Sequence, residues 1–98
     1  MIKDKVAIIT GASSGIGFAT ALALSKAGAK VAIGARRVDR LEELAKKITS
    51  EGGEVFFQKL DVTQRSECEN FAKAVLEKWG SIDILVNNAG LMPLSLFK

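Results

Sequence analysis

Short apolar runs alternate with longer stretches of helical periodicity along this chain. The apolar runs predict β-strands over Val6–Thr10, Lys30–Ala35, Val55–Leu60 and Ile82–Val86. The stretches between them predict helices over Gly15–Ala27, Val38–Ser50 and Gln64–Trp79. Repeated strand–helix–strand units with short connections favour a parallel sheet with right-handed crossovers. We therefore predict an α/β fold, a doubly wound sheet with helices on both faces.

The predicted helices differ in how their apolar residues are distributed. Gly15–Ala27 is apolar nearly all round, which predicts a well-buried helix. Val38–Ser50 and Gln64–Trp79 carry apolar stripes at helical spacing, as is typical of helices that cover a sheet with one face. Asp39, close to the start of the second helix, is predicted to cap it.

Composition and charge narrow the class of protein. The chain has 98 residues, of which 48% are hydrophobic and 26% charged, so it forms one globular domain or part of one. Its net charge of +3 arises from scattered Lys and Arg, so neither nucleic acid nor a membrane is an expected partner. No apolar stretch reaches the length of about 18 residues that a transmembrane helix needs. Cys68 is the only cysteine, which fits a reducing compartment and predicts a cytoplasmic protein.

A glycine-rich turn, Thr10–Gly17, joins the first predicted strand to the first predicted helix. Gly11 would let the chain turn off the strand, Gly15 would let the backbone approach a diphosphate, and Gly17 would let the helix pack close to the sheet. A strand, a glycine turn and a helix in this order are typical of a phosphate-binding site.

Residues between these glycines add hydrogen-bond donors for an anion. Ser13 and Ser14 supply hydroxyl groups, and the free N–H groups at the start of a helix favour negative charge. The spacing Gly-x-x-x-Gly-x-Gly differs from both the general dinucleotide fingerprint and the P-loop. The alternative is a turn that only connects strand to helix, but the strand before it and the helix after it favour the phosphate site.

The second predicted strand ends in Gly34-Ala35-Arg36-Arg37, where dinucleotide sites usually carry an acid for the ribose 2′-hydroxyl. A carboxylate there would repel a 2′-phosphate, whereas arginine would bind it, often through two parallel hydrogen bonds. Arg36 and Arg37 therefore predict NADP(H) rather than NAD(H) as the cofactor. The alternative interpretation is a pair of solvated arginines at the start of a helix.

Two further motifs follow the third and fourth predicted strands. Asp61 could accept a hydrogen bond from an adenine amino group, and Val62 could add a backbone contact. A helix cap at Asp61 or Thr63 is an equal alternative. Asn87–Gly90 places small residues and amides at a strand's carboxyl end, where open α/β sheets bind ligands, although taken alone this motif would be an ordinary turn.

In this order and spacing, the motifs closely resemble the short-chain dehydrogenase/reductase family over Lys3 to Gly90. The resemblance implies a Rossmann sheet with strand order 3-2-1-4. It also implies diphosphate contacts from Gly11 to Ile16 and adenine contacts at Asp61 and Val62. The resemblance further implies that Asn88, Ala89 and Gly90 lie along the adenosine ribose and the sheet edge. Family members with arginines after the second strand prefer NADP(H).

The sequence departs from this family in its length and in its catalytic residues. Members of the family are well over twice as long, and their catalytic Ser, Tyr and Lys, with an assisting Asn, come from the second half. The present sequence contains no tyrosine, so it cannot hold a Tyr-x-x-x-Lys pair. Residues 1–98 therefore resemble the N-terminal part of a single NADP(H)-binding Rossmann domain without its catalytic half. We name no catalytic residue and no metal ligand.

Three hypotheses about function follow. The first is a parent enzyme that reduces a carbonyl or oxidises an alcohol with NADP(H), whose 98-residue half is inactive alone. The second is a binding module that holds a nucleotide without turnover. The third is self-association, because Ile82–Val86 would form an exposed apolar sheet edge. This edge predicts a homo-oligomer.

Overall fold

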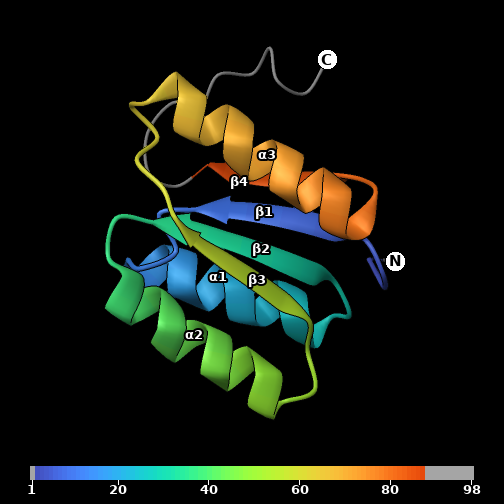
Figure 1. Cartoon of the computed structure of the whole chain (residues 1–98). Coiled ribbons are helices and arrows are strands. Elements are labelled where there is room, and N and C mark those ends of the chain that lie inside the picture. The colour runs from blue at the N-terminus through green and yellow to red at the C-terminus, as the bar shows by residue number, and fades with distance from the viewer. Residues whose placement is uncertain (1, 88–98) are drawn as a thin grey trace.

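The computed structural model describes residues 2–87 of the chain (Figure 1). Its strands are β1 (Val6–Thr10), β2 (Lys30–Ala35), β3 (Val55–Lys59) and β4 (Ile84–Asn87). Its helices are α1 (Gly15–Lys26), α2 (Val38–Ser50) and α3 (Arg65–Trp79). The predicted bounds of β1, β2 and α2 are confirmed at both ends, and the other elements begin or end one or two residues from the prediction.

The strands form one parallel sheet with the order β3-β2-β1-β4. Helices α1 and α2 cover one face of this sheet and α3 covers the other (Figure 1). This arrangement confirms the predicted α/β class and strand order. The chain leaves β1 on one face to reach β2 and arrives at β4 from the other face. The carboxyl end of β1 is therefore a switch point of the kind at which open α/β sheets bind ligands.

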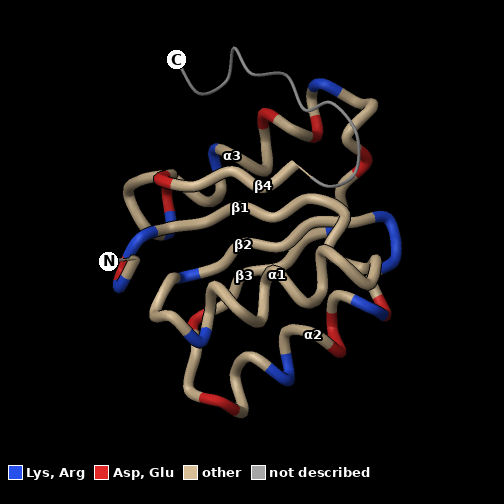
Figure 2. Tube along the Cα trace, turned by 180° about the vertical axis from the view of Figure 1, so that it is seen from behind, with Lys and Arg blue, Asp and Glu red and all other residues tan. Residues whose placement is uncertain are grey.

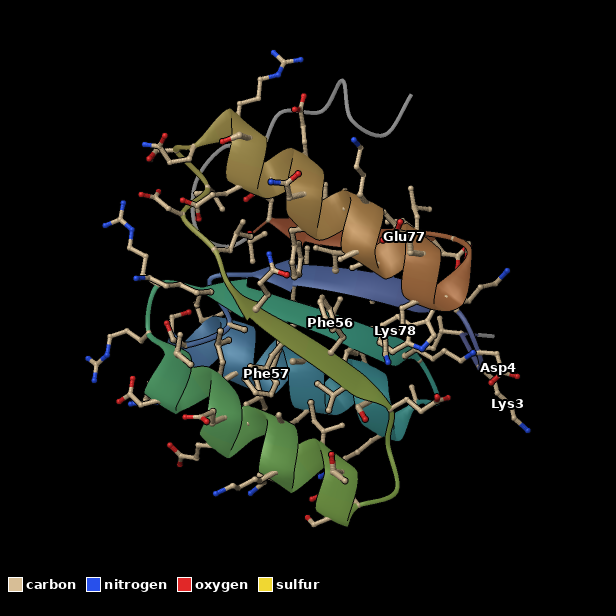
Figure 3. The ribbon with its side chains drawn as sticks, in the orientation of Figure 1. Lys3, Asp4, Phe56, Phe57, Glu77 and Lys78 are labelled. Carbon is tan, nitrogen blue, oxygen red and sulfur yellow. The ribbon has the colours of Figure 1, made fainter. Side chains whose placement is uncertain are left out.

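The sheet separates two apolar cores, because successive side chains of a strand point to opposite faces. Ile9 packs with apolar residues of α1 and α2, whereas Ile8 packs with Phe71 on the α3 side. Phe56 and Phe57 of β3 divide in the same way (Figure 3). The rings of Phe56 and Phe71 stack with centroids 6.0 Å apart. Charged residues lie mainly on the helices and connections, outside both cores (Figure 2).

The prediction that the first helix is well buried is wrong. Only Gly17 and Ala21 of α1 are buried, and the side of the helix away from the sheet carries exposed apolar residues such as Ala19 and Ala23. Ile16 is 74% exposed. A helix that lies on a sheet buries only one stripe of its residues. Because apolar residues are spread all round α1, those on its other sides are exposed to solvent in the described structure.

Asp83 explains why β4 starts two residues later than predicted. Its N–H donates to the Val6 carbonyl (2.8 Å), while its carboxylate Oδ2 accepts the Val6 N–H at 2.8 Å. A side chain therefore takes the Val6 N–H, and the paired register with β1 begins at Ile84. The Val6 N–H also lowers the pKa of the Asp83 carboxyl, because this hydrogen bond favours the ionised form.

This lowered pKa predicts an acid dependence of stability. A carboxyl whose pKa is lower in the folded state stabilises the fold above its ordinary pKa, about 3.9, and this contribution is lost as the pH falls through the folded value. Asp83→Asn should lower the melting temperature by a few degrees at pH 7 and flatten its fall between about pH 5 and pH 3. Thermal unfolding followed by circular dichroism measures both, with Glu77→Gln as the control. An unchanged acid profile in Asp83→Asn would contradict the assignment.

Candidate functional site

A cavity of about 280 Å³ lies where the carboxyl ends of β1, β2 and β3 meet. The last residue of β2 and residues of three connections line it: Gly11, Ser13, Ala35, Arg36, Arg37, Leu60, Val62 and Thr63. The glycine turn and the two arginines, which lie far apart in the sequence, thus meet at one place. A larger hollow of about 510 Å³ lies between α2 and β3, away from the glycine turn. We take the smaller cavity as the candidate site because its lining holds the predicted phosphate-binding groups.

The glycine turn leaves β1 through a left-handed residue and ends in a capped helix. Gly11 has φ 67°, a conformation that glycine adopts without steric cost. Ser14 is the N-cap residue of α1: its hydroxyl donates to the Gly11 carbonyl (2.9 Å) and accepts the Gly17 N–H (3.3 Å). Ser14 therefore shapes the turn itself, a role that the sequence analysis did not assign. Ser13 is half-buried and lines the cavity.

Gly15 stands at the first position of α1 with open space in front of it. A Cβ added there would meet nothing within 4 Å, so nothing described in the protein itself requires glycine at this position. The first turn of α1 contains no acidic side chain, which leaves the positive end of its dipole without a nearby carboxylate from that turn. Gly17 is buried, as close packing against the sheet would require. This geometry fits an anionic group in front of the helix.

Arg36 and Arg37 extend from the end of β2 with side chains that are 70% and 67% exposed. The Arg36 guanidinium lies 3.4 Å from the Asp61 carboxylate, an ion pair between the connections after β2 and β3. Arg37 occupies the N-cap position of α2 and makes no side-chain cap hydrogen bond. The prediction that Asp39 caps this helix is wrong, because Asp39 lies inside its first turn.

Arg37 and Asp39 form a forked ion pair. Arg37 Nη2 lies 3.1 Å from Asp39 Oδ2, and Arg37 Nε donates to Asp39 Oδ1 at 3.4 Å. The pair lowers the pKa of the Asp39 carboxyl and raises the pKa of the Arg37 guanidinium, mainly through the side-chain hydrogen bond. Both charges therefore persist across the physiological pH range.

Asp61 organises the turn before α3 through one of its oxygens. Its Oδ1 accepts the Thr63 N–H (3.0 Å), the Thr63 hydroxyl (2.7 Å) and the Arg36 guanidinium (3.4 Å). These bonds lower the pKa of the Asp61 carboxyl, with the Thr63 hydroxyl as the largest cause. The N-cap residue of α3 is Gln64, so the alternative prediction of a cap at Asp61 or Thr63 is wrong. Val62 lines the cavity and packs toward the α3 core.

The last predicted motif lies mostly outside the described residues. Asn87 ends β4, and its Oδ1 accepts a hydrogen bond from the Thr10 hydroxyl at 3.0 Å, which ties the carboxyl ends of β1 and β4 together. Thr10 is fully buried, and a polar residue at the end of an apolar strand was the available signal for this contact. Asn88, Ala89 and Gly90 lie outside residues 2–87. Among the helices that the structure describes, none has the length and apolar character needed to span a membrane.

Comparisons with known proteins agree with this fold and motif order. The sequence profile of the short chain dehydrogenase family matches residues 5–98. An uncharacterised oxidoreductase of Listeria monocytogenes is 49% identical over 94 residues, which are 96% of this chain and 38% of that protein. A metagenomic short-chain oxidoreductase solved in complex with NADP has 40% identity and a TM-score of 0.86, over 92% of this chain and 41% of that one. An alcohol dehydrogenase from Thermococcus sibiricus, complexed with 5-hydroxy-NADP, has 50% identity and a TM-score of 0.80, over 85% and 36% respectively.

The chain belongs to the short-chain dehydrogenase family. Its described residues form the first part of the Rossmann-type sheet that these solved relatives share. The chain spans only 38% of the length of the Listeria oxidoreductase. The match therefore establishes the family to which this chain belongs, but not the reaction that a whole enzyme would catalyse.

Proposed function

We propose that this chain is the NADP(H)-binding half of an oxidoreductase that transfers hydride between the cofactor and a carbonyl or alcohol substrate. The observation that carries this proposal is the cavity at the carboxyl ends of β1, β2 and β3, which joins the glycine turn to Arg36 and Arg37. Two solved relatives, each bound to NADP or a derivative of it, support the choice of cofactor.

The residues of the glycine turn would hold the diphosphate. The N–H groups of Ala12 and Ser14 already donate to the Gly34 and Gly11 carbonyls, so the other backbone N–H groups between Gly11 and Ile16 would donate to the diphosphate. The open space at Gly15 would let it approach the start of α1. Ser13 would add a hydroxyl group from the cavity wall. The dipole of α1, which no acidic side chain of its first turn offsets, would favour the same negative charge.

The connections after β2 and β3 would hold the adenosine end. Arg36 and Arg37 would bind the 2′-phosphate through charge-assisted hydrogen bonds. The described hydrogen bonds to the Asp61 carboxylate all go to Oδ1, so its other oxygen, Oδ2, would accept from the adenine amino group. Val62 would contribute its backbone beside the base. The resemblance to the family adds Asn88, Ala89 and Gly90 along the ribose.

When bound, the nicotinamide cofactor supplies or accepts the hydride. Hydride transfer also needs a side chain that donates a proton to the carbonyl oxygen or accepts one from the alcohol. The sequence contains neither tyrosine nor histidine, so two common side chains for this step are missing from it. We therefore propose that the 98-residue chain binds the cofactor without turnover.

A hydride-transfer assay tests whether the chain binds the cofactor without turnover. The purified chain should consume no NADPH above the uncatalysed rate with a panel of aldehydes and ketones, followed by absorbance at about 340 nm. The matched sample is the same chain with NADPH and no carbonyl compound, which corrects for cofactor decay. Carbonyl-dependent NADPH consumption would contradict the proposed absence of turnover.

We also propose that the chain self-associates through β4. Within residues 2–87 this strand pairs with β1 alone, and its residues Ile84, Leu85 and Val86 are only half-buried. An exposed apolar edge strand favours pairing with another chain. Sedimentation velocity at micromolar concentration should therefore detect a dimer or larger species, and a monodisperse monomer would contradict the proposal.

The proposed compartment is the cytoplasm. Cys68 of α3 is buried in the core between α3 and the sheet, and its thiol lies 3.6 Å from the Val62 carbonyl oxygen. Burial raises the pKa of this thiol, so it stays protonated and unreactive near neutral pH. A lone reduced cysteine of this kind is compatible with a reducing compartment.

A further inference from the structure

Each arginine at the candidate 2′-phosphate site is held by a carboxylate of the chain itself, but in different ways. Arg36 makes a single contact of 3.4 Å with Asp61, whose Oδ1 is already shared with Thr63. Arg37 makes two contacts with Asp39, at 3.1 and 3.4 Å. The second pairing is the tighter one, because both carboxylate oxygens face the fork formed by Nε and Nη2.

That fork is also the edge of a guanidinium that binds a phosphate group through two parallel hydrogen bonds. A 2′-phosphate at Arg37 would therefore compete with Asp39 for the same donors. Asp39 is fixed in the first turn of α2, so its carboxylate stays close to Arg37 in the free protein. Arg36 offers more of its donors, because Asp61 engages only Nη2.

We propose that Asp39 is a specificity-determining residue that acts through Arg37: its carboxylate occupies the phosphate-binding fork and weakens the preference for a 2′-phosphorylated nucleotide. This inference rests on the proposed NADP(H) site. Arg36 is then the first ligand of the 2′-phosphate, and Arg37 contributes fully only when Asp39 releases it. Asp39 is a positioning residue in this account and does not need to touch the nucleotide.

Removal of the Asp39 charge should strengthen binding of the 2′-phosphate specifically. We expect Asp39→Asn to raise the affinity for adenosine 2′,5′-bisphosphate about two- to fivefold, the range set by exposed ion pairs. Its affinity for AMP, which has no 2′-phosphate, should not change. Glu42→Gln is the matched control, since it removes an exposed carboxylate from the same helix at the α2–β3 hollow. It should leave both affinities unchanged.

A double-mutant cycle separates action through Arg37 from a general effect of charge. In an Arg37→Ala background, Asp39→Asn should lose its gain in bisphosphate affinity. Isothermal titration of the 98-residue chain with both nucleotides measures all of these affinities, and circular dichroism checks that each variant is folded. No gain in Asp39→Asn, or an equal gain without Arg37, would overturn the inference. Equal binding of the two nucleotides by the wild-type chain would instead contradict the proposed NADP(H) preference, on which this inference rests.

Discussion

Gly15→Ala is expected to weaken NADPH binding at least about tenfold while leaving the protein as stable as the wild type or slightly more so. The added Cβ would project into open space, since no atom lies within 4 Å of its position. Replacement of a glycine by alanine, at a backbone conformation that alanine also adopts, stabilises a protein by roughly 0.4–1 kcal/mol. The diphosphate, by contrast, needs the space that this Cβ would fill. Stability and binding should thus change in opposite directions.

Gly34→Ala is the matched control for this substitution. A Cβ at Gly34 would lie 2.8 Å from Leu60 Cδ2 and 3.0 Å from Leu60 Cβ, so the Leu60 side chain would have to shift to make room for it. Overpacking of this kind typically costs about 1–3 kcal/mol of stability. Urea unfolding and NADPH titration of both variants distinguish a ligand-binding glycine from a structural one. If Gly15→Ala bound NADPH as tightly as the wild type, the diphosphate would not lie against the start of α1.

The combined substitution Arg36→Ala and Arg37→Ala has the second large expected effect. Loss of charge-assisted hydrogen bonds to a phosphate lowers affinity about 10- to 150-fold, so NADPH binding should fall by an amount in this range. NADH lacks the 2′-phosphate, and its affinity should stay within about twofold. Fluorescence titration of the double variant with each nucleotide measures this difference directly.

The fold should tolerate this double substitution because both side chains are mostly exposed, at 70% and 67%. Arg65→Ala removes one exposed arginine on α3 that lies outside the lining of the candidate cavity, and it serves as the control for the loss of a surface arginine elsewhere. A parallel loss of NADPH and NADH affinity in the double variant would mean that the arginines do not read the 2′-phosphate.

Much of this fold could be predicted from the periodicity of the sequence. β1, β2 and α2 have the predicted bounds because their patterns end at glycines, polar residues or a change of period. The start of β4 could not be predicted, since Asp83 takes the Val6 N–H with its side chain instead of its backbone. The exposure of α1 was also mispredicted, because an apolar composition does not say on how many sides a helix is covered.

The candidate site was predictable as a set of residues but not as a network. The motifs predicted one cofactor site for the glycine turn and the arginines, and both line one cavity at the carboxyl ends of the strands, but their roles in binding stay a prediction. Their local partners were not visible in the sequence, because a hydroxyl or carboxylate can bind a ligand or its own backbone with the same chemistry. Ser14 caps α1, and Asp61 binds Thr63, because each turn folds back on itself, whereas Asp61 binds Arg36 because the connections after β2 and β3 lie next to each other.

We propose that the cavity beside Arg36 and Arg37 receives a 2′-phosphorylated dinucleotide. Isothermal titration of the unmodified chain with NADPH and with NADH, under the same salt and pH, tests it most directly. We expect one binding site per chain and an affinity for NADPH at least about tenfold higher than for NADH. Equal affinities, or tighter binding of NADH, would contradict it.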